Sequence, residues 1–145
     1  MSFKRVTVRR LKGALGAGTV AASLLASVVP VEAARQPTAA EAGAIERAAL
    51  RACDGHGPPG SSCEFHGARV STRDPHFAWA DVTTDGFSGV LLKRPSKATA
   101  HFHVVATQGG GIELCSKWRK QAPKRVLADL HVVGLRGNGS TGRCG

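Results

Sequence analysis

Residues 38–53, TAAEAGAIERAALRAC, place apolar side chains at the spacing of an α-helix. Thr38 and Glu41 stand three residues apart, the spacing at which each side chain can accept a hydrogen bond from the other residue's backbone N–H. Pro37 precedes them, and a Gly/Pro-rich loop follows Cys53. The pattern predicts an amphipathic helix that begins at Thr38 and ends at this loop.

Alternating apolar and polar residues then predict a series of short β-strands. The expected strands cover residues 65–73, 76–84, 89–94 and 98–107. In the second, Phe77 and Trp79 share one face, while alanines and Val82 share the other, and alternating aromatics of this kind are more often core than a ligand platform. Turn sequences such as DP and DG separate the strands at short intervals, so we expect an antiparallel meander.

The stretch TQGGGIELCSKWRKQAPKR, residues 107–125, joins the last strand to the C-terminal region. Its glycines are not followed by the Gly-Lys-Ser/Thr of a phosphate-binding loop, so they predict a positive-φ turn that leads to a returning strand at 112–114. Pro123 predicts the start of a short helix. The sequence HVVGL could add an edge strand, and residues 136–145 are expected to form a loop.

Four cysteines follow residue 33, and an even number in a short exported chain indicates two disulfides. Three pairings are possible. We favour Cys53–Cys63, which closes the 54–62 loop, and Cys115–Cys144, which fastens the C-terminus. A zinc–thiolate site is less consistent with the spacing, because no C-x-x-C is present. The expected fold is therefore α+β: an N-terminal helix packed on a small antiparallel β-sheet, with a short C-terminal helix and two disulfides.

Residues 1–33 have the pattern of an export signal. Five basic residues precede the apolar stretch 13–29, and Pro30 and the sequence VEA follow it. We expect cleavage after Ala33, which would give a monomeric secreted domain, residues 34–145, at the cell envelope or outside the cell. An uncleaved membrane anchor is the alternative; after cleavage no transmembrane segment is expected.

Charge adds a possible class of partner. The whole chain has a net charge of +10, and residues 34–145 retain about +6, with 15 Lys/Arg against nine Asp/Glu. This excess favours an anionic envelope polymer, a lipid headgroup or an acidic protein surface. No nucleic-acid motif is present, so specific nucleic-acid binding is not expected. A basic surface without a specific partner remains the alternative.

One cluster of basic residues is the main candidate for such binding. It consists of Lys117, Trp118, Arg119, Lys120, Lys124 and Arg125. The cations could neutralise phosphates, and the indole could stack on a ring. The alternative, which we favour, is a solvated segment in which Trp118 packs inward.

Two further functions have weaker support. His101 and His103 lie two apart in an expected strand, so both imidazoles could face a metal in a small metal-dependent hydrolase. The possible third ligands are His66, His76, His131 and Glu113. The other function is a protease inhibitor that presents the 54–62 loop. No catalytic residues or cofactor are assigned. The sequence GFSGV is not the G-x-S-x-G of a nucleophile elbow, because the second glycine follows Ser88 directly.

The order of several segments resembles small secreted actinobacterial proteins of uncharacterised function. These segments are RVSTRDPHFAWADV, GVLLKRP, FHVVATQGGGIELC and APKRVLADL, within about residues 45–135. The resemblance implies an exported domain in which two strands, a cysteine and a Pro-started helix follow the Asp-Pro segment. It implies no catalytic residues.

Overall fold

The computed structural model describes residues 34–55 and 60–145. The fold belongs to the unit Val31–Gly145. The expected export signal, residues 1–33, lies outside the described residues, as do positions 56–59 of the loop considered for protease inhibition.

The N-terminal helix α1, Ala39–Asp54, begins with the predicted reciprocal cap. The backbone N–H of Glu41 donates to Thr38 Oγ1 at 3.3 Å, and the Thr38 N–H donates to Glu41 Oε2 at 2.9 Å. The side chains of Ile45 and Ala49 are fully buried. Thus the helix and its buried face both follow the sequence prediction.

Four antiparallel strands form the sheet, in the order β1-β2-β3-β4 predicted for a meander. They are β1 (Glu64–Val70), β2 (Phe77–Thr84), β3 (Phe87–Lys93) and β4 (His103–Gly109). Together with α1, this sheet confirms the α+β class.

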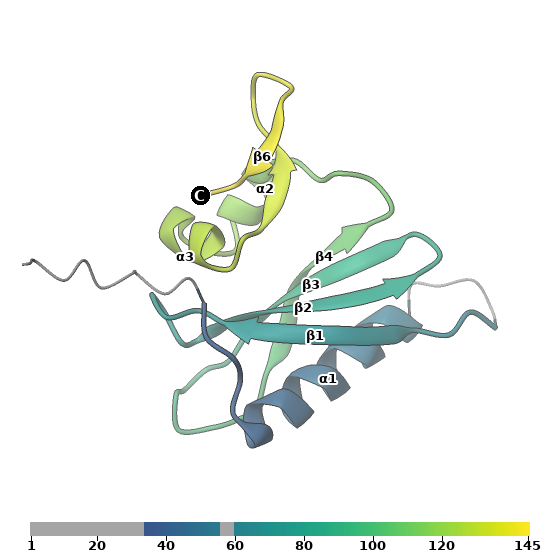
Figure 1. Cartoon of the computed structure of the whole chain (residues 1–145), viewed down its shortest axis with the longest axis vertical. Helices are drawn as coiled ribbons and strands as arrows, with labels where there is room; N and C mark the ends of the chain where they lie inside the picture. The colour runs from purple at the N-terminus through teal and green to yellow at the C-terminus, as the bar shows by residue number, and fades with distance from the viewer. Residues whose placement is uncertain (1–33, 56–59) are drawn as a thin grey trace, which may run out of the picture. The chain divides into compact units, whose positions relative to one another are not determined.

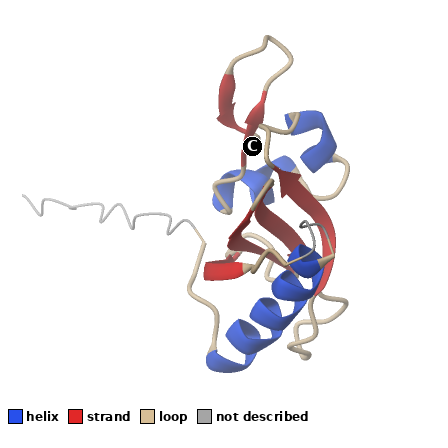
Figure 2. Cartoon of the chain, turned by 90° about the vertical axis from the view of Figure 1, so that its right-hand side faces the viewer, coloured by secondary structure: helices blue, strands red, loops and turns tan. Residues whose placement is uncertain are grey.

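Both faces of the sheet are covered, and Figures 1 and 2 show α1 on one side and the short C-terminal elements on the other. On β2, Ala78 and Ala80 pack with the buried face of α1, whereas Phe77 and Trp79 pack with the C-terminal elements. Alternation along a strand sends neighbouring side chains to opposite faces. The prediction that the two aromatics belong to the core is confirmed.

Strand β4 begins at His103, so the expected start at residue 98 is wrong. A turn occupies the preceding segment, in which the Thr99 N–H and hydroxyl both donate to the Ser96 carbonyl, at 3.4 and 3.2 Å. The buried Arg94 also donates to the Thr99 carbonyl. These local bonds take the backbone away from the sheet despite the alternating sequence.

A bulge in β4 also reverses its alternation. Leu92 pairs with Val104, but the preceding Leu91 pairs with Ala106, so Val105 is an extra residue opposite β3. Val104 consequently packs on the α1 side and Ala106 on the other. Simple alternation along residues 98–107 places Val104 and Ala106 on one face, since a bulge leaves no mark on the sequence pattern.

The chain beyond β4 forms a layer of short elements, which we call the C-terminal layer (residues 114–145). It contains α2 (Cys115–Arg119), α3 (Lys124–Asp129), β5 (Val133–Leu135) and β6 (Thr141–Arg143). The helix that follows Pro123 and the strand in HVVGL are confirmed. The helix α2 was not predicted, and β6 lies where a loop was expected.

The glycines before this layer do not act as predicted. None of the three, residues 109–111, has a positive φ, and no strand covers 112–114; only Leu114 forms a single parallel bridge, with Leu135. A Cβ on Gly110 would lie 3.0 Å from the Cα of Gly86. Glycine at 110 therefore permits close approach to the β2–β3 turn.

Both favoured disulfides are present. Cys53 pairs with Cys63, and Cys115 at the start of α2 pairs with Cys144 beyond β6. A Cβ on Gly134 of β5 would lie 2.7 Å from the Cys144 sulfur. The second disulfide therefore packs directly against the β5–β6 hairpin.

Two residues after the end of helix α3, the chain passes through a residue with a positive φ. His131 has φ 55°, and the N–H groups of His131 and Val132 donate to the carbonyls of Ala128 and Leu127. Glycine is the usual residue at this position of such a cap. We expect His131→Gly to raise the free energy of unfolding by about 0.5–1 kcal/mol, because the exposed imidazole is replaced by a residue without a Cβ penalty.

Urea unfolding of the purified protein would measure this gain. Ala128→Gly is a suitable control, since it places glycine inside the helix and should destabilise the protein by about 1 kcal/mol. An unchanged or lowered midpoint for His131→Gly would contradict the assignment of backbone strain.

Candidate functional site

The charges of the chain are divided between its parts. Residues 34–113 contain eight Lys/Arg and eight Asp/Glu, whereas residues 114–145 contain seven Lys/Arg and a single acidic residue, Asp129. The net positive charge of residues 34–145 therefore comes entirely from the C-terminal layer. Such segregation creates a local positive potential that the total charge alone does not reveal.

Asp129 is buried and is used inside the protein. Its carboxylate accepts hydrogen bonds from the Ser71 hydroxyl at 2.6 Å and the Thr72 N–H at 2.7 Å, both in the turn after β1. Burial alone would raise the pKa of Asp129, but the hydrogen bonds from Ala34, Ser71, Arg73 and Thr72 outweigh it and hold the pKa below its ordinary value. Asp129 thus ties α3 to the sheet and remains ionised.

The predicted cations lie on the surface of α2, α3 and the segment between them. Lys120, Lys124 and Arg125 are exposed, and none of their side chains has an ion-pair or hydrogen-bond partner within residues 34–55 and 60–145. Lys117 is also exposed, but it pairs with Glu113 at 2.8 Å. Exposed pairs of this kind contribute only about 0–1 kcal/mol, so Lys117 can exchange Glu113 for another anion.

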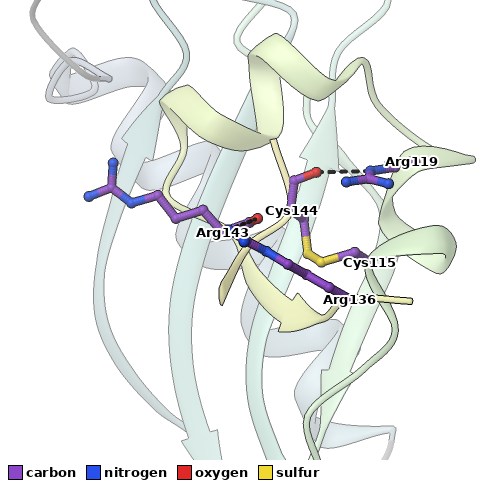
Figure 3. The surroundings of a disulfide bond; sticks show 5 residues. All are labelled: Cys115, Arg119, Arg136, Arg143 and Cys144. Carbon is purple, nitrogen blue, oxygen red and sulfur yellow. Dashed lines mark hydrogen bonds between the residues drawn. A yellow bond between two sulfur atoms is a disulfide. The ribbon is translucent and has the colours of Figure 1, made fainter. Parts of the chain in front are cut away.

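Arginines surround the Cys115–Cys144 disulfide, as Figure 3 shows. Arg119 Nε donates to the Cys144 carbonyl at 3.0 Å, and Arg136 Nη2 donates to the Arg143 carbonyl at 3.4 Å. The guanidinium of Arg143 extends away from the disulfide. Arg136 and Arg143 are absent from the sequence-predicted cluster, although the favoured pairing of Cys144 with Cys115 could have indicated that they join it.

Trp118 does not belong to this surface. Its side chain is fully buried and meets Trp79 edge to face, with ring centroids 5.4 Å apart. The inward packing favoured from the sequence is confirmed, and a stacking role for the indole at the surface is wrong. We use the term basic surface for the seven cations of residues 114–145: Lys117, Arg119, Lys120, Lys124, Arg125, Arg136 and Arg143.

The candidate metal ligands are dispersed. His101 precedes β4 and His103 is its first residue, and both are exposed. Three of the possible third ligands are engaged elsewhere: His66 with Thr83, His76 with Asp74, and Glu113 with Lys117. His131 lies at the end of α3. Across the part of the chain that the structure describes, no group of three or more His, Cys, Asp or Glu could hold a metal ion.

None of the helices in the described ranges is both long and apolar enough to span a membrane. A scan of protein-family models and searches of curated proteins and solved structures find no match to this chain.

Proposed function

We propose that this protein is an exported, disulfide-stabilised domain that binds a phosphate-bearing anionic polymer of the cell envelope through its basic surface. The main support for this proposal is the uneven distribution of charge. Residues 114–145 contain seven cations and one buried acidic residue, whereas the charges of residues 34–113 balance. The expected export signal and the two disulfides support location outside the cytoplasm, because disulfides persist in oxidising compartments.

The distribution of the cations suits a repeating anion. They come from α2, α3, the segment between these helices and the β5–β6 hairpin, so an extended polymer could contact several at once. Guanidinium groups can also hold phosphate oxygens in pairs. Binding would release counterions from the polymer and would therefore weaken as the salt concentration rises.

A second candidate partner, an anionic bilayer surface, is favoured by a separate observation. The exposed large apolar side chains in the described ranges are Ile112, Leu114 and Val133, with exposed fractions of 48%, 55% and 42%. The segments that carry them lie side by side through the Leu114–Leu135 bridge. Apolar groups beside cations are typical of proteins that bind the headgroup region of anionic membranes.

The double variant Lys120→Glu and Lys124→Glu should weaken binding to inorganic polyphosphate by about tenfold or more at low salt, because two unpaired cations become anions. The slope of log affinity against log salt should also become shallower by about two. Fluorescence anisotropy with a labelled polyphosphate, repeated across salt concentrations, measures both effects.

The matched control is Arg47→Glu with Arg51→Glu. Both arginines are exposed on α1, across the sheet from the basic surface, and the change in net charge is identical. Equal weakening by the two double variants would exclude a localised site. A second experiment measures binding to phosphatidylglycerol vesicles. If the protein binds these vesicles but not polyphosphate, and Leu114→Ser abolishes vesicle binding, the partner is an anionic bilayer and not the polymer.

A further inference from the structure

The backbone nitrogen of Ala34 occupies an unusual position, because it enters the buried Asp129 network. Its N–H donates to Asp129 Oδ1 at 2.9 Å. The same carboxylate also accepts from Ser71, Thr72 and Arg73. Asp129 is only 7% exposed, so this oxygen lies where a charged partner is worth more than it would be in water.

Ala34 also has a backbone angle that an internal alanine rarely adopts. Its φ is 35°, in the left-handed region where the Cβ crowds the backbone. The angle φ is defined by the carbonyl carbon of the preceding residue. Removing that residue abolishes the restriction and leaves the nitrogen free to orient all its protons.

The residues immediately after Ala34 are firmly held. The N–H of Arg35 donates to the Val70 carbonyl at 2.8 Å, and the Val70 N–H donates to the Arg35 carbonyl at 2.9 Å. The Arg35 guanidinium also forms two hydrogen bonds with Glu41, at 2.7 and 2.8 Å. Ala34 itself packs against the core of the C-terminal layer. Its nitrogen is thus fixed opposite Asp129 by contacts on the C-terminal side of the bond expected to be cut.

We propose that hydrolysis of the Ala33–Ala34 bond by a signal peptidase creates an α-ammonium group that forms an ion pair with Asp129. Water supplies the hydroxyl of the new Ala33 carboxylate, which leaves with the signal, and the amine that remains on Ala34 takes a proton. In the mature protein this ion pair fastens the C-terminal layer to the N-terminal segment, which Arg35 joins to the end of β1.

The inference uses the cleavage position expected from the sequence and is independent of the anionic partner. Its structural basis lies in the Ala34–Asp129 geometry. A neutral amide offers Asp129 one proton, whereas an ammonium offers three together with a full charge, and charge-assisted hydrogen bonds are roughly twice as strong as neutral ones. Processing would therefore strengthen a contact that the chain already makes.

The first test identifies the N-terminus. The full-length chain is expressed with export, and the secreted protein is analysed by mass spectrometry. The expected sequence starts Ala-Arg-Gln-Pro-Thr, from residue 34. Any other N-terminus, or an uncleaved chain, overturns the proposal.

The second test measures the reactivity of the new α-amine with a selective acylating reagent at about pH 6.5, where lysines are almost fully protonated. An ion pair with Asp129 keeps the amine protonated and buried. Asp129→Asn should therefore increase the labelling rate by about tenfold or more, the factor that corresponds to one pKa unit.

Ser71→Ala is the matched control, since it removes a hydrogen bond from the same carboxylate without removing the charge. Its labelling rate should stay near that of the wild-type protein. If Asp129→Asn does not fold, the wild-type protein is labelled with and without urea, and at least about tenfold native protection is expected. The ion pair is overturned if Asp129→Asn is labelled at the wild-type rate, or if the native and urea-unfolded wild-type proteins are labelled at equal rates.

Discussion

Replacing Glu41 with glutamine should lower the free energy of unfolding at neutral pH by about 3 kcal/mol, because it breaks a buried ion pair and leaves a buried arginine without a charged partner. Glu41 accepts from the Arg35 guanidinium at 2.7 and 2.8 Å and from Arg94 Nη1 at 2.9 Å. Arg94 is only 4% exposed. Its remaining partners, the Pro75 and Thr99 carbonyls and the Phe102 ring, carry no formal charge.

Glu41 also makes the free energy of unfolding depend on pH in the acid range. The hydrogen bond with Arg35 is the largest influence on the pKa of Glu41; burial opposes it, and Thr38 and Arg94 assist it, so the pKa falls from 4.5 to about 2. The unfolded chain binds a proton at a higher pH than the folded protein does. This stabilisation is therefore complete above pH 4.5 and is lost as the pH falls towards about 2.

Urea unfolding between pH 7 and pH 2 tests both statements. The wild-type and Glu41→Gln curves should differ most at neutral pH and converge in acid, since the wild-type carboxyl becomes neutral there. Glu46→Gln, at an exposed position of α1, is the control and should change stability by less than about 0.5 kcal/mol. Parallel curves for wild type and Glu41→Gln would contradict the assigned role of the carboxylate.

Trp118→Ala should lower the free energy of unfolding by about 3–5 kcal/mol, the usual range for truncating a large buried aromatic residue. The indole is fully buried against Trp79, and among the described residues its Nε1–H has no hydrogen-bond partner. Trp118→Phe should therefore be much milder, since it keeps an aromatic ring and removes an unsatisfied donor. Thermal unfolding followed by near-ultraviolet circular dichroism compares the two variants.

These variants also separate packing from binding. Folded Trp118→Phe should bind polyphosphate with the affinity of the wild-type protein, because the buried indole cannot stack on a ligand. A large loss of polyphosphate affinity in Trp118→Phe, with unchanged stability, would contradict this expectation and indicate that the indole contributes to binding.

The parts of the fold that sequence predicted correctly depend on neighbouring residues. The cap between Thr38 and Glu41 needs three residues of spacing, and the opposite faces of Phe77 and Ala78 need only alternation. The cysteine pairing followed from loop closure. Each signal is contained within a short segment or limited to a few alternatives.

The parts that sequence missed depend on distant contacts. The late start of β4 follows from a turn held by Ser96 and Arg94, and the bulge at Val105 is set by pairing with β3. The basic surface was predicted only along one segment. Arg136 and Arg143 join it because the second disulfide returns the chain to Cys115.

That disulfide also has a mechanical consequence. Cys115 and Cys144 are 29 positions apart, and their disulfide closes the intervening chain into a covalent loop. All seven cations of the basic surface lie within this loop. A partner that pulls on any of them cannot draw this loop out into extended chain. A pulling force on the C-terminal layer would then act on its contacts with the sheet, which include the Asp129 hydrogen bonds and the packing of Trp118 on Trp79. The basic surface is therefore built to resist tension as one piece.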